Sequence, residues 1–91
     1  MSDNLEKFSE ALRLLSSNSR PMRELVYDAY VNHLKDVELS ELPPKIKIIF
    51  ESVVLRLTSV VPPGDIGNDE AGYLADDILY MAKALQSQKE P

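Results

Sequence analysis

Residues 45–60 read KIKIIFESVVLRLTSV, and this stretch decides the fold class because it can be interpreted as a strand or as a helix. Its β-branched residues favour a strand. However, no turn-forming residue interrupts residues 45–59, and so long a strand is uncommon. At helical spacing its large apolar residues share one face: Ile46, Ile49, Phe50, Val53, Leu57 and Val60. Pro43 and Pro44 precede the stretch, as is usual where a helix begins. We therefore predict a helix over 45–60.

Apolar residues recur at helical spacing in three other stretches, and we predict helices over 3–16, 21–37 and 69–86. The stretch 21–37 is apolar over most of its circumference, which predicts that it is the central helix. The last helix has a clean apolar stripe of Ala71, Leu74, Ala75, Ile78, Met81, Ala82 and Leu85. We predict one all-α domain over residues 1–91, either a four-helix bundle-like fold or an orthogonal packing of the same helices.

Length and composition narrow the class of protein. The chain has 91 residues, of which 44% are hydrophobic, so one packed core is expected. It has no cysteine, so neither a disulfide nor a thiolate metal site is expected. No apolar run is long enough to cross a bilayer, and the first 15 residues do not resemble a signal peptide. We expect a cytoplasmic protein with no membrane association.

The charge pattern bears on the partner. The net charge is −5, and residues 60–91 contribute most of it, whereas the basic residues are scattered singly. Nucleic-acid binding requires clustered lysine and arginine, so no nucleic-acid partner is expected. An acidic balance favours a basic protein partner. The alternative, which stays open, is that the negative net charge only keeps the protein soluble.

No motif predicts catalysis, a metal or another cofactor. His33 is the only histidine, and no nucleophile or carboxylate lies at a fixed spacing from it, so we expect it to be hydrogen-bonded in or beside the core. Asp65, Asn68, Asp69 and Glu70 do not match the spacing of an EF-hand loop, which predicts helix capping and turns instead. We expect a protein that is not an enzyme; an enzyme with dispersed carboxylates is the weaker alternative.

The helix predicted over 69–86 carries a candidate protein-binding site. Tyr73 and Tyr80 are seven residues apart and lie opposite the apolar stripe, with Asp76 and Asp77 beside them. Tyrosines among acidic residues on an exposed face are typical of interfaces. The alternative is that both rings lie flat against a neighbouring helix.

The helix predicted over 45–60 carries a candidate oligomer interface. Ile48 and Leu55 lie off its core face, seven residues apart and next to Ser52 and Ser59. We expect another surface to shield such large aliphatic side chains from solvent. This surface is either another helix of the same chain or a second copy of the protein. In the second case the two stripes would pair with each other across a two-fold axis.

Three short segments resemble a group of small bacterial helical proteins to which no activity is assigned. They are YDAYVNHL (27–34), ELPP (41–44) and PPGDIG (62–67). The resemblance implies a bacterial cytoplasmic protein and adds nothing on mechanism. Our leading hypothesis is a non-enzymatic protein–protein interaction module, homo-oligomeric or not. The alternative is an acidic inhibitor that occludes a basic enzyme, by analogy with immunity proteins in size, charge and helicity.

Overall fold

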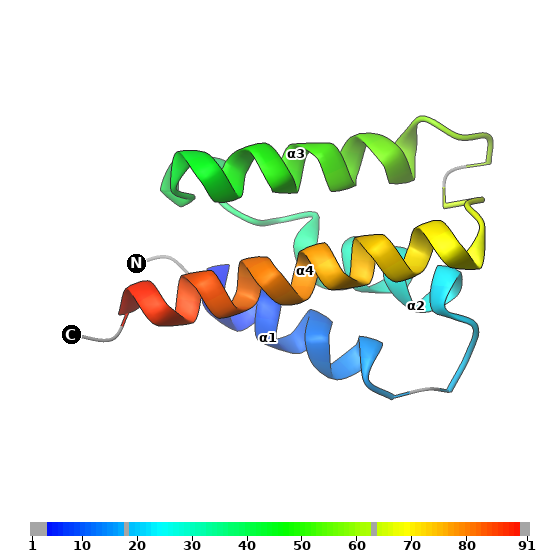
Figure 1. The fold of residues 1–91 in the computed structure, drawn as a ribbon, viewed down its shortest axis with the longest axis horizontal. Coiled ribbons are helices and arrows are strands. Elements are labelled where there is room, and N and C mark those ends of the chain that lie inside the picture. Colours follow the sequence, from blue (N-terminus) through cyan, green and yellow to red (C-terminus); the bar gives the residue numbers. More distant parts are fainter. Residues whose placement is uncertain (1–3, 18, 63, 90–91) are drawn as a thin grey trace.

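The computed structural model describes residues 4–17, 19–62 and 64–89, and within them all regular secondary structure is helical (Figure 1). In chain order the elements are α1 (Asn4–Leu15), α2 (Met22–Ala29), the π-helix η1 (Tyr30–Leu34), the 3₁₀-helix η2 (Leu39–Glu41), α3 (Pro44–Thr58) and α4 (Asn68–Lys89). The all-α prediction is confirmed, including a helix in the ambiguous stretch. Asp3, the predicted first residue of the first helix, lies outside the described residues.

The central helix is α4. It lies between α3 on one side and α1 and α2 on the other, and it makes close backbone contacts with all three (Figure 1). It runs antiparallel to α3. Ala71 and Ala82 are buried on α4, and small side chains at a contact let helix axes approach closely. The prediction that the stretch 21–37 is central is therefore wrong.

The helix predicted over 21–37 is not a regular α-helix. It changes to a π-helix after Ala29, and the Lys35 N–H donates to the Tyr30 carbonyl, five residues earlier, at 2.7 Å. A backbone hydrogen bond spans five residues in a π-helix and four in an α-helix, so a π turn contains one extra residue. Consequently Ala29 and Leu34, five residues apart, are both fully buried, whereas His33 lies half-buried at the edge of the core.

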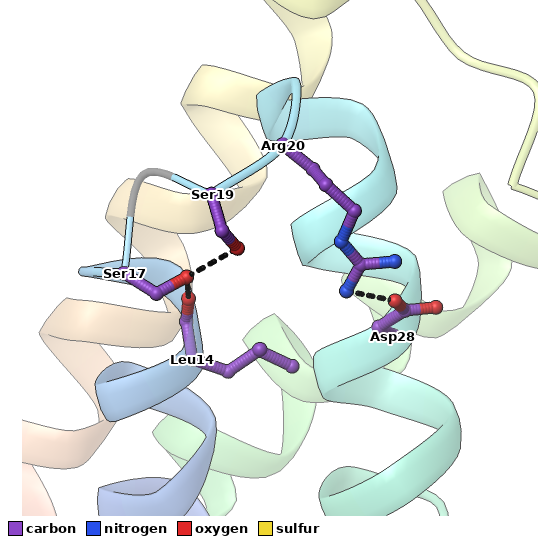
Figure 2. Close-up of polar contacts among 5 residues, drawn as sticks. All are labelled: Leu14, Ser17, Ser19, Arg20 and Asp28. Atoms are coloured by element: carbon purple, nitrogen blue, oxygen red, sulfur yellow. Dashed lines mark hydrogen bonds and ion pairs between the residues drawn. The ribbon is translucent and has the colours of Figure 1, made fainter.

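Local polar contacts hold the connection between α1 and α2 (Figure 2). The Ser17 hydroxyl donates to the Leu14 carbonyl at 2.7 Å and lies 3.0 Å from the Ser19 hydroxyl. Arg20 forms an ion pair with Asp28 in the next helix. One set of contacts thus lies at the end of α1, and the ion pair links the connection to the last turn of α2.

The core joins all four α-helices. The rings of Phe8 on α1 and Phe50 on α3 meet edge to face, with centroids 6.0 Å apart. Val53 and Leu57 are buried as predicted. Two loop residues, Leu42 and Ile66, are also buried. Neither belongs to a periodic pattern, so the sequence did not indicate them.

Gly64 fixes the loop between α3 and α4. Its φ is +85°, a left-handed conformation that favours glycine. A Cβ at this position would lie 2.5 Å from the ring of Tyr27, so the loop backbone rests directly on that ring. The Gly64 N–H donates to the Leu57 carbonyl at 2.8 Å. Only glycine satisfies both the φ and the close approach.

Among the described residues, no helix combines the length and the apolar character that crossing a membrane requires.

Candidate functional site

Both tyrosines of the predicted protein-binding site expose more than half of their surface to solvent. Tyr73 is 69% exposed and Tyr80 is 52% exposed. Asp76 is exposed between them and Asp77 is half-buried. The fold therefore leaves two aromatic rings in solvent on the outer side of its central helix, about 10 Å apart along the axis.

Asp69 belongs to the same surface. Asp69, Tyr73, Asp76 and Tyr80 follow one another at intervals of four, three and four residues, which places them in one line along α4. We call these four residues the α4 face. In the described part of the chain, neither Asp69 nor Asp76 forms an ion pair. The sequence indicated only helix capping and turn formation for Asp69.

A hollow opens beside this face at the amino end of α4. Its volume is about 430 Å³. It is lined by Met22 from α2 and by Asn68, Asp69, Gly72, Tyr73, Ala75 and Asp76 from α4. The Asn68 side-chain oxygen accepts from the Arg23 backbone N–H at 3.4 Å, so a polar contact joins the two helices next to the hollow. The hollow thus combines an aromatic ring, two carboxylates and an apolar wall.

Gly72 has no role that the fold explains. It lies inside α4, where glycine is destabilising by about 0.5–1 kcal/mol relative to alanine. Its φ is not in the left-handed region, and beyond its chain neighbours and the adjacent backbone of α4 a Cβ built on it would have no atom within 4 Å. This is the opposite of Gly64, which the fold requires. What the missing side chain at Gly72 does provide is open space in the hollow.

The residues of the predicted oligomer interface lie on the open surface of α3. Ile48 is 68% exposed and Leu55 is 65% exposed, and Ser52 and Ser59 are exposed with them. We call these four residues the α3 stripe. In the described part of the chain, therefore, no other helix shields the α3 stripe from solvent, and the first of the two alternatives is excluded there. A second copy of the protein is the alternative that stays open.

An apolar groove of about 370 Å³ lies next to the α3 stripe, and the sequence did not indicate it. It separates α3 from η1 and the segment that follows. Its lining residues are Tyr30, Lys35, Val37, Leu39, Phe50, Glu51, Val54, Leu55 and Thr58. Leu55 borders both the groove and the stripe, so apolar surface continues from one to the other. The broad apolar circumference of the stretch 21–37 predicts a central helix, but residues of this stretch such as Tyr30 line the groove instead of packing against a further helix.

Neither of the other candidate groups forms a site for a metal. His33 shares a small hollow with Glu6, Glu10 and Asp36, and it is half-buried there, at the margin of the core. In the acidic group at the start of α4, Glu70 is 3.5 Å from Arg56, which ties it to α3. Across residues 4–17, 19–62 and 64–89, no three histidine, cysteine or acidic side chains are grouped to hold a metal ion.

Comparison with known proteins finds no match: no family model, no curated protein and no solved structure resembles this chain significantly.

Proposed function

We propose that this protein is a non-enzymatic protein-binding module whose α4 face contacts a basic protein. The observation that carries the proposal is the exposure of Tyr73 and Tyr80 on the outer side of the central helix. Tyrosine supplies a large, rigid contact area together with a polar hydroxyl, and it is enriched where proteins bind one another.

The charge around the tyrosines defines the partner. Asp69, Asp76 and Asp77 lie on or beside the α4 face without an ion pair in the described part of the chain. A surface of this kind repels acidic partners and attracts basic ones, and it accelerates the encounter more than it strengthens the complex. Tyr73 and Tyr80 supply the desolvated contact that sets the affinity.

One form of this proposal is an inhibitor, in which the α4 face covers the basic active site of an enzyme. The acidic charge and small helical domain support it by analogy. The proposal also includes a bacterial cytoplasmic location, which rests on the resemblance of residues 27–34, 41–44 and 62–67.

Photo-crosslinking tests the proposal. Benzoylphenylalanine replaces Tyr73 or Tyr80, and in a control variant it replaces Gln86, which is exposed on α4 but off the α4 face. We expect both tyrosine positions to crosslink the same basic protein, and the Gln86 position not to do so.

The crosslinked protein is then purified, and its affinity for the variants is measured. Tyr73→Ala and Tyr80→Ala should each weaken binding by about 1–4 kcal/mol without unfolding the protein. Asp76→Asn and Asp77→Asn should lower mainly the association rate, and added salt should do the same. If the tyrosine variants unfold while their folded fraction binds with unchanged affinity, the tyrosines are packing residues and the proposal is wrong.

A second candidate function is self-association through the α3 stripe. The exposure of Ile48 and Leu55 supports it, since no helix in the described part of the chain covers them. Charge supports it too: the four residues of the stripe are neutral, so two copies of an acidic chain meet there with little repulsion.

A further inference from the structure

We propose that the hollow beside Gly72 receives an arginine side chain of the basic partner. This inference rests on the proposed function, and it names the group by which the partner is held. It concerns the hollow beside the amino-terminal half of the α4 face, which Asp69, Gly72, Tyr73 and Asp76 line from adjacent turns of the helix.

The chemistry of the hollow matches a guanidinium group. Tyr73 offers an aromatic face, on which arginine stacks more readily than lysine. Asp69 and Asp76 stand seven residues apart, on either side of Tyr73 along the helix, and each carboxylate accepts two parallel N–H bonds from a guanidinium. Met22 and Ala75 supply apolar wall for the aliphatic part of an arginine side chain.

Gly72 provides the room. A side chain at this position would project into open space, because beyond its two chain neighbours and the adjacent backbone of α4 no atom lies within 4 Å of the place that its Cβ would take. The fold gains nothing from glycine here, and a helix interior is less stable with it than with almost any other residue. An arginine that enters the hollow explains why the position is left without a side chain.

A metal ion does not fit the same place. The hollow is wide, and a hard cation requires several oxygen ligands converging at about 2.0–2.6 Å. In the part of the chain that the structure describes, no group of three histidine, cysteine or acidic side chains meets that requirement. The lining of the hollow therefore suits an organic cation such as a guanidinium group better than a bare metal ion.

The test uses fluorescein-labelled octa-arginine and octa-lysine peptides as probes, with binding followed by fluorescence anisotropy at low salt. Gly72→Met fills the hollow, and Gln86→Met is the matched control on an exposed part of the same helix. We expect wild type and Gln86→Met to bind octa-arginine more tightly than octa-lysine. Gly72→Met should bind octa-arginine about tenfold more weakly.

Thermal unfolding separates this effect from a structural one. Methionine has a higher helix propensity than glycine, so Gly72→Met should unfold at the same temperature as wild type or at a higher one. A substitution that raises stability and lowers affinity cannot act by damaging the fold. A variant that is less stable than wild type would contradict the claim that Gly72 has no structural role.

The remaining outcomes distinguish this inference from the proposed function. If Tyr80→Ala weakens octa-arginine binding and Gly72→Met does not, the arginine site is wrong and the α4 face stands. Equal affinity for octa-arginine and octa-lysine would overturn the choice of arginine, as would the absence of any binding by wild type. The crosslinking experiment decides the proposed function independently of these peptides.

Discussion

The side-chain amide of Asn4 pairs with the backbone of Glu38 through both of its polar atoms. Its Oδ1 accepts from the Glu38 N–H at 2.8 Å, and its Nδ2 donates to the Glu38 carbonyl at 3.0 Å. Asn4 is only 4% exposed, so water cannot replace these bonds. The pair joins the start of α1 to the segment after η1, which lies 34 residues further along the chain.

Asn4→Asp tests this pair, because it keeps the size and one acceptor but replaces the donating nitrogen with an oxygen. We expect the free energy of unfolding to fall by about 1–3 kcal/mol, since the Glu38 carbonyl loses its partner and a charge is buried. Urea denaturation at neutral pH measures the change. Ser9→Ala, at an exposed site on α1, is the control and should have little effect. Equal stability of Asn4→Asp and wild type would show that the pair is not energetically significant.

Phe50→Ala should lower the free energy of unfolding by about 3–5 kcal/mol, because it leaves a cavity and removes the edge-to-face contact with Phe8. Denaturant unfolding gives the value. Ile48→Ala removes an apolar side chain of comparable character from the exposed side of the same helix, and it should cost less than about 0.5 kcal/mol. Similar losses in the two variants would mean that the core face of α3 is assigned incorrectly.

Gly64→Ala should be destabilising by about 2 kcal/mol or more, because alanine disfavours the positive φ and its Cβ would meet the ring of Tyr27. Gly67→Ala is the matched control at the end of the same loop, since beyond its two chain neighbours a Cβ there would have no atom within 4 Å. We expect this control to lose about 1 kcal/mol of stability or less, because Gly67 precedes the first residue of α4 and alanine is a poorer N-cap than glycine. Differential scanning calorimetry of both variants measures their unfolding temperatures. An equal decrease in the two variants would contradict the prediction.

Deletion of Asn32 should be tolerated, because it removes one exposed residue from the π turn and lets a regular α-helix bring Leu34 to the core. Deletion of Glu24, an exposed residue of the regular helix α2, should be strongly destabilising, since it rotates every following core residue by about 100°. Thermal unfolding of the two variants, followed by circular dichroism, compares them. The interpretation of η1 as a one-residue insertion fails if both deletions are equally harmful.

Leu55→Glu should yield a folded monomer if the α3 stripe pairs with itself. The side chain is 65% exposed in one copy, so the fold does not depend on it, whereas a two-fold contact would bury a charge on each side. Sedimentation velocity over a range of concentrations measures the mass. Val61→Glu, also at an exposed apolar residue but outside α3, is the control and should leave association unchanged. A wild-type protein that stays monomeric at high concentration rules out the dimer.

Periodicity was sufficient to predict the four helices because each one buries a single face. It also placed Tyr73 and Leu55 off the core, and both are exposed. Features that depend on where helices meet could not be read in this way. The central position of α4 is one of them: its periodicity shows which residues are buried, such as Ala71, but not how many helices pack against them.

The rest of the candidate site was hidden for similar reasons. The hollow beside Gly72 requires Met22, a residue 50 positions away, and no local pattern relates the two. Asp69 has an ordinary explanation as an acidic residue in the first turn of a helix, where the dipole favours it. The π turn at Tyr30 replaces α-helical hydrogen bonds with longer ones. No particular residue type marks this change, so the sequence does not show it.

The central position of α4 has a consequence for how the chain matures. This helix makes close contacts with α1, α2 and α3, yet it follows all of them in the sequence. A ribosome that synthesises the protein therefore releases three amphipathic helices before the one that joins them. Although α1 and α2 also contact one another, the core surface that α4 covers on all three helices stays exposed until residues 68–85 have emerged, and only then is the core complete. The nascent chain is accordingly most vulnerable to aggregation and proteolysis just before its last helix is complete.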